Sequence, residues 1–204
     1  MEVTYSDLKN KRVFISGGGS GIGATIVEYF CEQKSEVYFI DIDLKSSNKL
    51  IKKIKKKGFK VPKFIECNIL DVKKLQNIIK DIISKKGAIH CLINSAANDD
   101  RHTTEQVDEK YWENRMGINL KHYFFAAQAV VKGMKKIKSG SIVNLSSVSW
   151  VLGEGDKVVY ETAKSAVVGL TRSFAQEFGK YNIRTNSVIP GSIATERQIK
   201  HWLT

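Results

Sequence analysis

The chain lacks any apolar run long enough to cross a membrane, because no stretch approaches about eighteen consecutive apolar residues. Its first ten residues are polar and lack the apolar core of a secretory signal. These absences argue against a membrane-spanning helix and against a signal of this kind. We therefore expect a cytoplasmic protein without a membrane partner.

Cysteine is also scarce. The three cysteines, Cys31, Cys67 and Cys91, are odd in number, lie far apart in the sequence and stand in apolar contexts. Disulfide frameworks and zinc sites depend on paired or closely spaced cysteines. The pattern therefore favours reduced thiols in the core, and the sequence predicts neither a disulfide nor a metal site.

Acidic residues are too few to balance the basic ones, since 33 lysines and arginines against 21 aspartates and glutamates give a net charge of +12. Such an excess can attract polyanions. Much of it is lysine, as in residues 52–57, where Ile51 and Ile54 keep the apolar stripe of a helix. Lysines without interleaved aromatics or arginines are typical of a solvated helix face, and we expect no nucleic-acid partner.

Strands and helices alternate regularly along the chain. With 204 residues, of which 42% are hydrophobic, it can form a substantial core, and we interpret residues 1–204 as one domain. Because parallel neighbours need crossover helices, the alternation predicts an α/β fold with a doubly wound parallel sheet. The predicted strands are 12–16, 36–40, 61–67, 89–93, 141–145 and 184–189, and the predicted helices are 24–30, 44–57, 71–86, 108–137 and 158–181.

A glycine-rich turn follows the first predicted strand directly and leads into a helix. Glycine is needed in such a turn because a side chain would block a dinucleotide pyrophosphate from the helix N-terminus and would prevent close packing of helix on strand. The turn therefore predicts a dinucleotide-binding site. Its candidate residues are Gly17, Gly19, Ser20, Gly21, Ile22 and Gly23.

The second predicted strand ends in Asp41, eighteen residues after Gly23. A carboxylate at this position can accept hydrogen bonds from both hydroxyls of the adenosine ribose and repels a 2′-phosphate. Ile42 follows, and no arginine stands in the glycine turn or just after the strand. The sequence therefore predicts NAD, in preference to NADP, although an aspartate here also suits the N-cap of the next helix.

A second cluster of residues indicates chemistry on a hydroxyl group. Tyr160 and Lys164 are four residues apart in a predicted helix, so their side chains share one face. A free tyrosine titrates at about pH 10, and a nearby ammonium favours its phenolate form. Ser147, at the end of the preceding apolar run, could place its hydroxyl beside the same substrate oxygen.

Ser147 and Tyr160-x-x-x-Lys164 together resemble the signature of the short-chain dehydrogenase/reductase family, and the spacing of Gly17, Gly21 and Gly23 resembles its glycine motif. The resemblance covers the whole chain. It implies strand order 3-2-1-4-5-6, a Rossmann fold, with the cofactor across the switch point of the sheet.

The same resemblance implies roles for further residues. Asn119 matches the fourth catalytic residue of the family, which holds a water that links Lys164 to solvent. Asn68 stands where the family usually has an aspartate, but its amide carbonyl can accept the same hydrogen bond from adenine. The remaining cofactor contacts that the resemblance implies are Ile69, Asn94, Ala96, Tyr160, Lys164, Pro190, Gly191, Ile193 and Thr195.

Three segments resemble the sugar-oxidising branch of the family, the NAD-dependent D-xylose and other aldose 1-dehydrogenases. They are residues 98–102, Ser149-Trp150, and Arg197-Gln198 with Trp202. The resemblance implies oxidation of an aldose at C1 to a lactone.

In that reaction Tyr160 is the base, Lys164 lowers its pKa, and Ser147 positions the oxygen. The further candidate sugar contacts are Asn98, Trp150 and Gln198, because amides offer paired donors and acceptors and tryptophan offers a flat apolar face.

Family members continue through a substrate lid and a seventh strand, whereas this sequence stops at Thr204. We expect it to lack both and to be truncated. A complete member is expected to form a homodimer or homotetramer. Two alternative functions stay open: a reductase of carbonyls or 3-oxoacyl thioesters using NAD or NADP, and a truncated nucleotide-binding module without catalysis.

Overall fold

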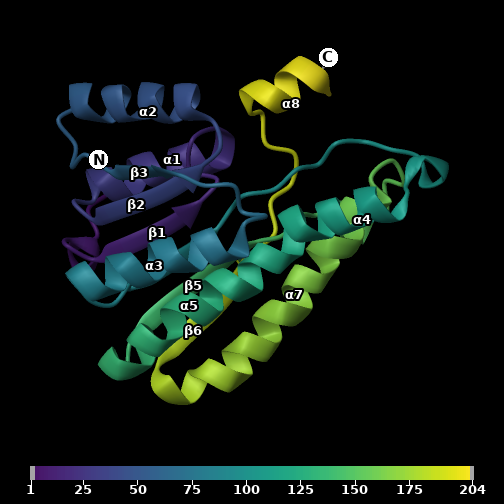
Figure 1. Ribbon diagram of the computed structural model, residues 1–204. Coiled ribbons are helices and arrows are strands. Elements are labelled where there is room, and N and C mark those ends of the chain that lie inside the picture. Colours follow the sequence, from purple (N-terminus) through teal and green to yellow (C-terminus); the bar gives the residue numbers. More distant parts are fainter. Residues whose placement is uncertain (1–2, 203–204) are drawn as a thin grey trace.

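Six parallel strands form the central sheet of the structure, a computed structural model that describes residues 3–202 (Figure 1). Their order is β3-β2-β1-β4-β5-β6, which confirms the predicted fold class and strand order. The strands are β1 (Arg12–Ser16), β2 (Glu36–Asp41), β3 (Lys63–Glu66), β4 (Cys91–Asn94), β5 (Gly140–Leu145) and β6 (Ile183–Val188).

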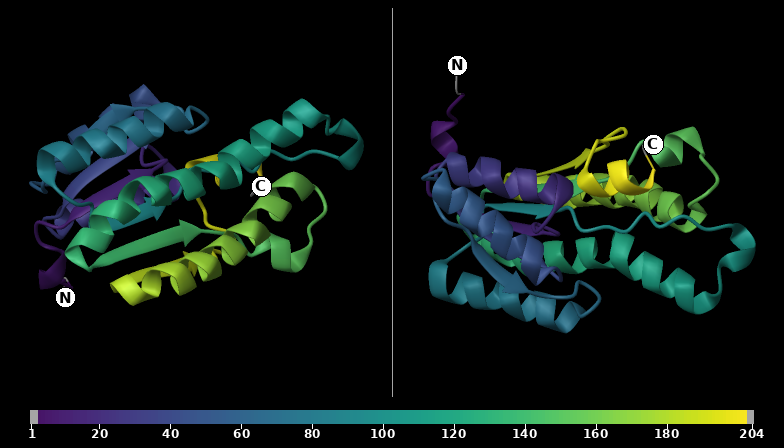
Figure 2. Two further views of the ribbon diagram at one scale, coloured as in Figure 1. Left: turned by 60° about the horizontal axis from the view of Figure 1, so that its bottom comes forward. Right: turned by 90° about the horizontal axis from the view of Figure 1, so that it is seen from above.

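Helices cover both faces of this sheet, with α1 and α2 on one side and α3, α5 and α7 on the other (Figures 1 and 2). Short 3-10 turns lie at Ser6–Leu8, Thr104–Gln106 and Gly179–Tyr181. The α-helices are α1 (Gly21–Glu32), α2 (Leu44–Lys56), α3 (Val72–Lys86), α4 (Glu109–Met116), α5 (His122–Ile137), α6 (Ser149–Leu152), α7 (Val158–Phe178) and α8 (Glu196–His201).

The central strands are apolar along their length because helices cover both of their faces. In β1, Val13, Phe14 and Ile15 have no exposed surface. Val13 and Ile15 belong to one core cluster with Val27 of α1, whereas Phe14 belongs to the opposite cluster with Leu75 of α3. The alternation of side chains along the strand therefore divides the interior into two cores that share one sheet.

Several predicted boundaries shift by one to three residues. The strand predicted over 61–67 is only Lys63–Glu66, because its pairing with β2 begins at Lys63. The strand predicted over 89–93 is Cys91–Asn94. The last predicted helix ends at Phe178 and continues as a 3-10 turn. The helix predicted from residue 71 begins one residue later, because the Asp71 carboxylate accepts the Lys74 N–H as an N-cap.

The long helix predicted over 108–137 is interrupted at Gly117. α4 ends at Met116, a π-helical turn occupies Gly117–Lys121, and α5 begins at His122. Such turns inside helices are often found at functional sites. This one buries Asn119 completely, close to the carboxyl ends of the strands.

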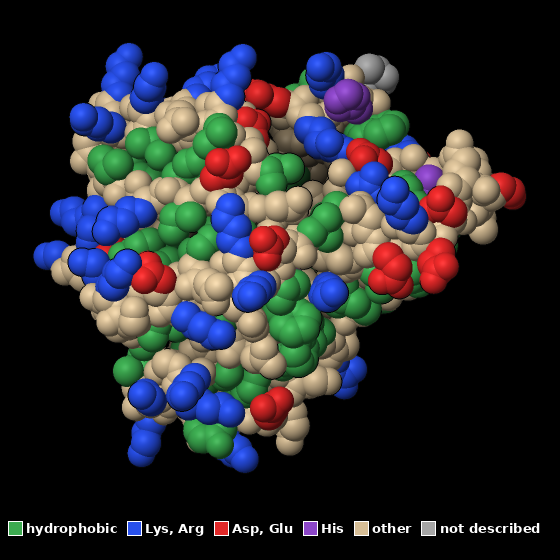
Figure 3. All heavy atoms as spheres, in the orientation of Figure 1, with side chains coloured by type: hydrophobic (Ala, Val, Ile, Leu, Met, Phe, Trp, Pro, Cys, Tyr) green, Lys and Arg blue, Asp and Glu red, His purple; other side chains and the backbone are tan. Residues whose placement is uncertain are grey.

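The three cysteines all carry free thiols. Within residues 3–202, no helix is both long and apolar enough to cross a membrane. The same residues contain no cluster of His, Cys, Asp or Glu side chains arranged to hold a metal ion. On the face in Figure 3, the basic side chains are scattered, with acidic ones among them.

The glycine turn lets β1, α1 and the segment after β4 approach more closely than side chains would allow. A Cβ atom at Gly23 would lie 1.9 Å from the Gly17 carbonyl oxygen. A Cβ atom at Gly17, which has a φ of +69°, would lie 2.6 Å from Ala96 Cα. Both clashes are with backbone, so no side-chain rearrangement could relieve them.

We expect Gly23→Ala to lower the free energy of unfolding by about 3 kcal/mol or more, because the added methyl group must push α1 away from β1. The matched control is Gly169→Ala in α7, where a Cβ atom would meet no heavy atom within 4 Å. That variant should gain roughly 0.5–1 kcal/mol from the better helix propensity of alanine. Urea denaturation measures both, and equal stabilities would contradict the packing role of Gly23.

Candidate active site

The predicted site residues gather at the carboxyl ends of the strands. β1 and β4 are neighbours in the sheet, but the chain continues from them in opposite directions, to β2 and to β5. In open α/β sheets this arrangement leaves a crevice beyond the strand ends, where ligands bind. Figure 3 shows the surface hollowed beneath α8, at this end of the molecule.

The glycine turn presents unused backbone donors to this crevice. The N–H groups of Gly17 and Gly18 donate to the Ile40 carbonyl oxygen at 2.9 and 3.1 Å. No side chain caps the start of α1, and no acceptor within residues 3–202 receives the N–H groups of residues 21–23. Free amides at a helix N-terminus suit an anionic group such as a pyrophosphate.

Asp41 lies beside this turn at the end of β2. Its Oδ2 accepts the Gly19 N–H at 2.8 Å, and its Oδ1 accepts the Asp43 N–H at 2.9 Å. A Cβ atom at Gly19 would lie 2.9 Å from the Asp41 carboxyl carbon. The glycine turn and the acid are therefore held in direct contact, an arrangement that fits a dinucleotide with its ribose over Asp41.

The next cofactor candidates lie after β3. Asn68 is exposed, and its Oδ1 accepts the Leu70 N–H at 3.0 Å, forming a local turn. Its amide N–H groups remain free of partners within residues 3–202, and Ile69 beside it is half-buried. The predicted adenine contact must therefore share the Asn68 carbonyl with the backbone.

Asn94, a predicted cofactor contact, steadies the middle of the sheet. It is fully buried, and its Nδ2 donates to Asn144 Oδ1 at 2.9 Å, which ties β4 to β5. Ser16 Oγ accepts the Ala96 N–H at 3.3 Å, so the segment after β4 is also tied to β1. Together these bonds fix the floor of the crevice.

The segment from Pro190 to Thr195 returns across this floor. The Pro190 carbonyl oxygen accepts the Val148 N–H at 3.0 Å, and the Ile193 carbonyl oxygen accepts the Thr195 N–H at 2.7 Å. The methyl group of Thr195 lies 3.5 Å from where a Cβ atom of Gly21 would be. Thr195 also caps α8 by accepting the Gln198 N–H. Gly191 is exposed and has no neighbour that a Cβ atom would meet.

Ser147, Tyr160 and Lys164 come together beyond the end of β5. Ser147 Oγ shares a hydrogen bond of 2.9 Å with Ser149 Oγ, and its interaction with the Tyr160 hydroxyl lowers the pKa of that tyrosine. Lys164 Nζ lies 5.5 Å from the centre of the Tyr160 ring. The three residues that sequence analysis grouped are therefore neighbours in the structure.

The ammonium of Lys164 is held by partners that the sequence did not predict. Only 1% of this residue is exposed. Its Nζ donates to the Tyr123 hydroxyl at 2.9 Å and to the Leu145 carbonyl oxygen at 2.8 Å. Burial lowers the pKa of Lys164 to about 7, although the nearby Asp99 acts to raise it.

The arrangement does not lower the pKa of Tyr160, contrary to the prediction. Burial is the largest effect and raises the pKa of Tyr160 to about 12, with the negative charges of Asp99 and Glu154 adding to the increase. Only the hydrogen bond with Ser147 opposes it. The prediction fails because Lys164 directs its hydrogen bonds to Tyr123 and Leu145, leaving the phenol of Tyr160 without an ammonium partner.

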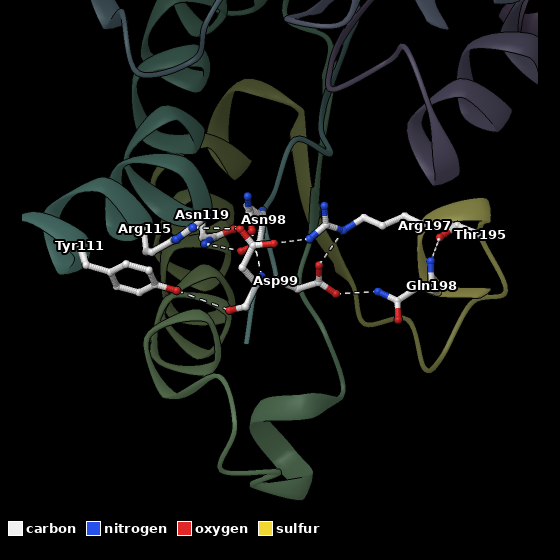
Figure 4. A network of polar contacts seen from close by, with 9 residues as sticks. Asn98, Asp99, Tyr111, Arg115, Asn119, Thr195, Arg197 and Gln198 are labelled. Carbon is white, nitrogen blue, oxygen red and sulfur yellow. Dashed lines mark hydrogen bonds and ion pairs between the residues drawn. The ribbon is translucent and has the colours of Figure 1, made fainter. Parts of the chain in front are cut away.

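Asn119 is linked to the loop after β4 by a pair of hydrogen bonds (Figure 4). Its Oδ1 accepts the Asn98 N–H at 2.8 Å, and its Nδ2 donates to the Asn98 carbonyl oxygen at 3.0 Å. The side chain of Asn119 thus fixes the backbone of Asn98. The three segments that resemble the sugar-oxidising branch (98–102, 149–150, and 197–198 with 202) are together called the rim. The side chain of Asn98 itself accepts the Asp100 N–H at 2.8 Å.

Two carboxylates of the rim hold α8 in place (Figure 4). Asp99 accepts from Arg197 Nε at 3.2 Å and from Gln198 Nε2 at 2.6 Å. Asp100 bridges Arg197, at 2.5 Å, and Arg115 of α4, at 2.9 Å. The predicted sugar contact Gln198 is thus bound to Asp99, so a ligand reaching it must also meet the carboxylate.

The rim segments also carry two tryptophans, Trp150 and Trp202. Trp150 in α6 is half-buried, and its Nε1 has no partner within residues 3–202. The guanidinium of Arg101 lies 4.3 Å from the centre of the Trp202 ring, a second link between α8 and the loop after β4. Residues 98–102 and α8 are therefore close to one another in space.

Sequence reasoning placed residues 98–102 at the rim but gave Asp99 and Asp100 no role of their own. The available signal was the complementary charge of Arg197, which pairs with both across about a hundred residues of chain. Tyr123 was also missed, since one tyrosine in an apolar helix looks like a core residue. Its contact with Lys164 depends on how α5 and α7 pack.

The chain is similar to known proteins over almost its whole length. Residues 11–203 match the family described as short chain dehydrogenase. The chain is 40% identical over 200 residues to the probable galactose dehydrogenase GalD of Rhizobium meliloti (strain 1021) and covers 78% of that protein with 98% of its own length. It is 42% identical over 201 residues to D-xylose 1-dehydrogenase of Caulobacter vibrioides (strain NA1000 / CB15N), with the same coverage.

Among solved structures, the chain is similar to the ligand-free aldohexose dehydrogenase (AldT) of Thermoplasma acidophilum. The TM-score is 0.83 at 29% sequence identity, and the match covers 96% of this chain and 72% of that one.

The buried ammonium predicts a specific pH dependence of stability. The pKa of Lys164 falls from its ordinary value of 10.5 to about 7 in the folded state. Between these values the unfolded chain binds one more proton than the folded chain, so stability gains about 1.4 kcal/mol per pH unit as pH rises. We expect this slope to be absent in Lys164→Met, where the Tyr123 hydroxyl keeps its bond to the Leu145 carbonyl.

The measurement is urea denaturation of wild type and Lys164→Met from about pH 7 to 9. Other titrating groups act on both proteins, so the difference between the two curves isolates Lys164. Wild type should gain stability relative to the variant across this range. Parallel curves would show that Lys164 titrates at its ordinary pKa.

Proposed function

The chain belongs to the short-chain dehydrogenase family, and on this premise we propose that it oxidises an aldose of the D-xylose type at C1 to the lactone, with NAD as hydride acceptor. As a member of the family it is an oxidoreductase that uses a nicotinamide cofactor on a small-molecule substrate. The observation that carries the sugar proposal is the polar rim around Asp99, beside Tyr160 and Lys164.

The roles of the site residues in this proposal follow from their positions. When bound, the nicotinamide cofactor accepts the hydride from C1. The phenolate of Tyr160 takes the proton from the C1 hydroxyl, so the carbonyl of the lactone forms as the C–H and O–H bonds break. Ser147, which interacts with the Tyr160 hydroxyl, positions the sugar oxygen. Asn119 supports the proton relay from the back of the site.

Lys164 supplies the positive charge that this mechanism needs. An ammonium has three N–H donors, and Lys164 uses two of them within the protein. The third is available to the ribose of the cofactor or to the phenolate. An ammonium that donated this third N–H to the phenol would oppose the increase in the pKa of Tyr160 that burial causes.

Sugar recognition is assigned to the rim. A sugar carries many hydroxyl groups, each of which is both a donor and an acceptor, and amides and carboxylates satisfy such groups well. Asn98 and Gln198 offer amides, Asp99 offers acceptors, and Trp150 offers a ring face and an unpartnered N–H. An acyl thioester has fewer hydrogen-bonding groups than a sugar and would leave many of these polar side chains without partners.

The test is formation of reduced nicotinamide, followed by its near-ultraviolet absorbance, with a panel of pentoses and hexoses. We expect turnover on at least one aldose and a loss of about 100-fold or more in kcat for Tyr160→Phe, because a general base contributes this much. Binding of the reduced cofactor, followed by its fluorescence, should persist in the variant.

Tyr181→Phe, which removes a hydroxyl just beyond α7, is the matched control and should keep wild-type turnover. Turnover on 3-oxoacyl thioesters without any on aldoses would replace the sugar proposal. Binding of NAD without turnover on either panel would favour a nucleotide-binding module.

The choice of NAD over NADP is tested at Asp41. Asp41→Asn removes the charge that repels a 2′-phosphate but keeps an oxygen for the Gly19 N–H. We expect the ratio of kcat/KM for NAD to that for NADP to fall by about tenfold or more, an energy of about 1.4 kcal/mol. Steady-state kinetics with both cofactors gives the ratio.

Asp43→Asn is the control, since it removes the same charge two residues further on, from the N-cap of α2. If this control changes the ratio as much as Asp41→Asn, overall charge decides the preference and Asp41 has no special role.

A further inference from the structure

Tyr123 is the residue of α5 whose hydroxyl group contacts the ammonium of Lys164. It is fully buried. Its hydroxyl donates to the Leu145 carbonyl oxygen at 2.9 Å and accepts from Lys164 Nζ at 2.9 Å, while Nζ donates to the same carbonyl oxygen at 2.8 Å. Phenol, carbonyl and ammonium thus form a closed triangle of hydrogen bonds.

The carbonyl in this triangle stands where the sheet ends. β4 pairs with β5 only as far as Asn94 and Asn144, and Leu145 is the next residue of β5. Beyond that last pair, Leu145 accepts from two side chains. The end of the strand therefore anchors Lys164, with Tyr123 on α5 as the second support.

The groups around Lys164 provide little other support for its charge. His122 of α5 is neutral near pH 7, because burial and the nearby Lys164 lower its pKa to about 3. Tyr160, one turn earlier on α7, is protonated at neutral pH because its pKa is raised. Asp99, from the loop after β4, acts on Lys164 through its charge without a hydrogen bond to Nζ.

We infer that Tyr123 is a positioning residue of the dehydrogenase, whose hydroxyl holds the ammonium of Lys164 at the end of β5 and helps to keep it charged. The reaction needs both properties, because only a charged and correctly placed Lys164 can favour the phenolate of Tyr160. The inference concerns the protein alone and does not depend on which sugar is oxidised.

A purely structural role for Tyr123 predicts a different effect on the titration of Lys164, so an experiment can distinguish the two roles. Tyr123→Phe keeps the ring that packs between α5 and the sheet and removes only the hydroxyl. If the ring alone matters, the titration of Lys164 is unchanged. If the hydroxyl supports the charge, its removal lowers the pKa of Lys164, since one acceptor is lost from a buried cation.

The experiment is an NMR titration of the lysine side-chain nitrogens in the cofactor-free protein, with the Lys164 signal assigned by its absence in Lys164→Met. We expect the pKa of Lys164 to fall by about one to two units in Tyr123→Phe, as for the loss of one hydrogen bond to a charged group. In Tyr123→Gln, which offers an amide oxygen as acceptor, the pKa of Lys164 should be closer to that of wild type. This variant also tests the inference if the phenylalanine variant folds poorly.

Tyr38→Phe is the matched control. Tyr38 is 4% exposed and its hydroxyl bonds to Glu36 on β2, away from Lys164. This variant should leave the Lys164 titration as in wild type. An unshifted titration in Tyr123→Phe, with thermal stability like that of Tyr38→Phe, would overturn the inference.

A second measurement uses the proposed sugar reaction and rests on that proposal. In Tyr123→Phe we expect kcat to fall about tenfold or more with little change in the KM for the sugar, and the pH dependence of kcat to change. If no aldose is oxidised by wild type, the proposed function fails while the NMR titration still decides the role of Tyr123.

Discussion

The close approach of β1, α1 and the segment after β4 is the constraint on which the rest of the structure depends. Gly23 touches the backbone of Gly17, and Gly17 in turn touches the backbone of Ala96. Because β1 and β4 are parallel neighbours whose connections diverge, this contact lies at the base of the crevice. It sets α1 with its free amides over the sheet, and it places the loop after β4 where Asn119 can bind it. The proposed dinucleotide site and the proposed substrate rim thus lie on the two sides of one backbone contact.

Much of this could be read from the sequence, because the strands of a doubly wound sheet are short apolar runs and the glycines of the turn have few other uses. The positions of Ser147, Tyr160 and Lys164 at the strand ends follow from the same reasoning. The hydrogen bonds of Lys164 do not, since Tyr123 is forty-one residues away and reaches Nζ only through the packing of α5 against α7. Spacing along one helix predicted that Lys164 faces Tyr160, but it could not show which acceptors compete for the ammonium.

For the same reason, the sequence did not predict the ion pairs of the rim. Asp99 and Asp100 look like an ordinary polar loop, and Arg197 like the start of an exposed helix. Their pairing spans nearly half of the chain, and it forms because α8 follows β6, whose end lies beside the end of β5. Once formed, the network does more than hold α8. It neutralises part of the negative charge of Asp99, which otherwise raises the pKa of both Tyr160 and Lys164.

Unpartnered polar atoms are costly inside a protein, at about 1–3 kcal/mol each, so where they occur is informative. Within residues 3–202, Ser47 Oγ lies beside the glycine turn and Asp41, Asn94 Oδ1 lies at the end of β4, and Trp150 Nε1 lies beyond β5. All three belong to segments that border the crevice, as do the free amides of α1. Among the same residues, Thr185 Oγ1 in β6 is also buried without a partner. Part of the unused hydrogen-bonding capacity of the fold thus lies where a ligand rich in oxygen atoms would bind, and both a dinucleotide and a sugar are ligands of this kind.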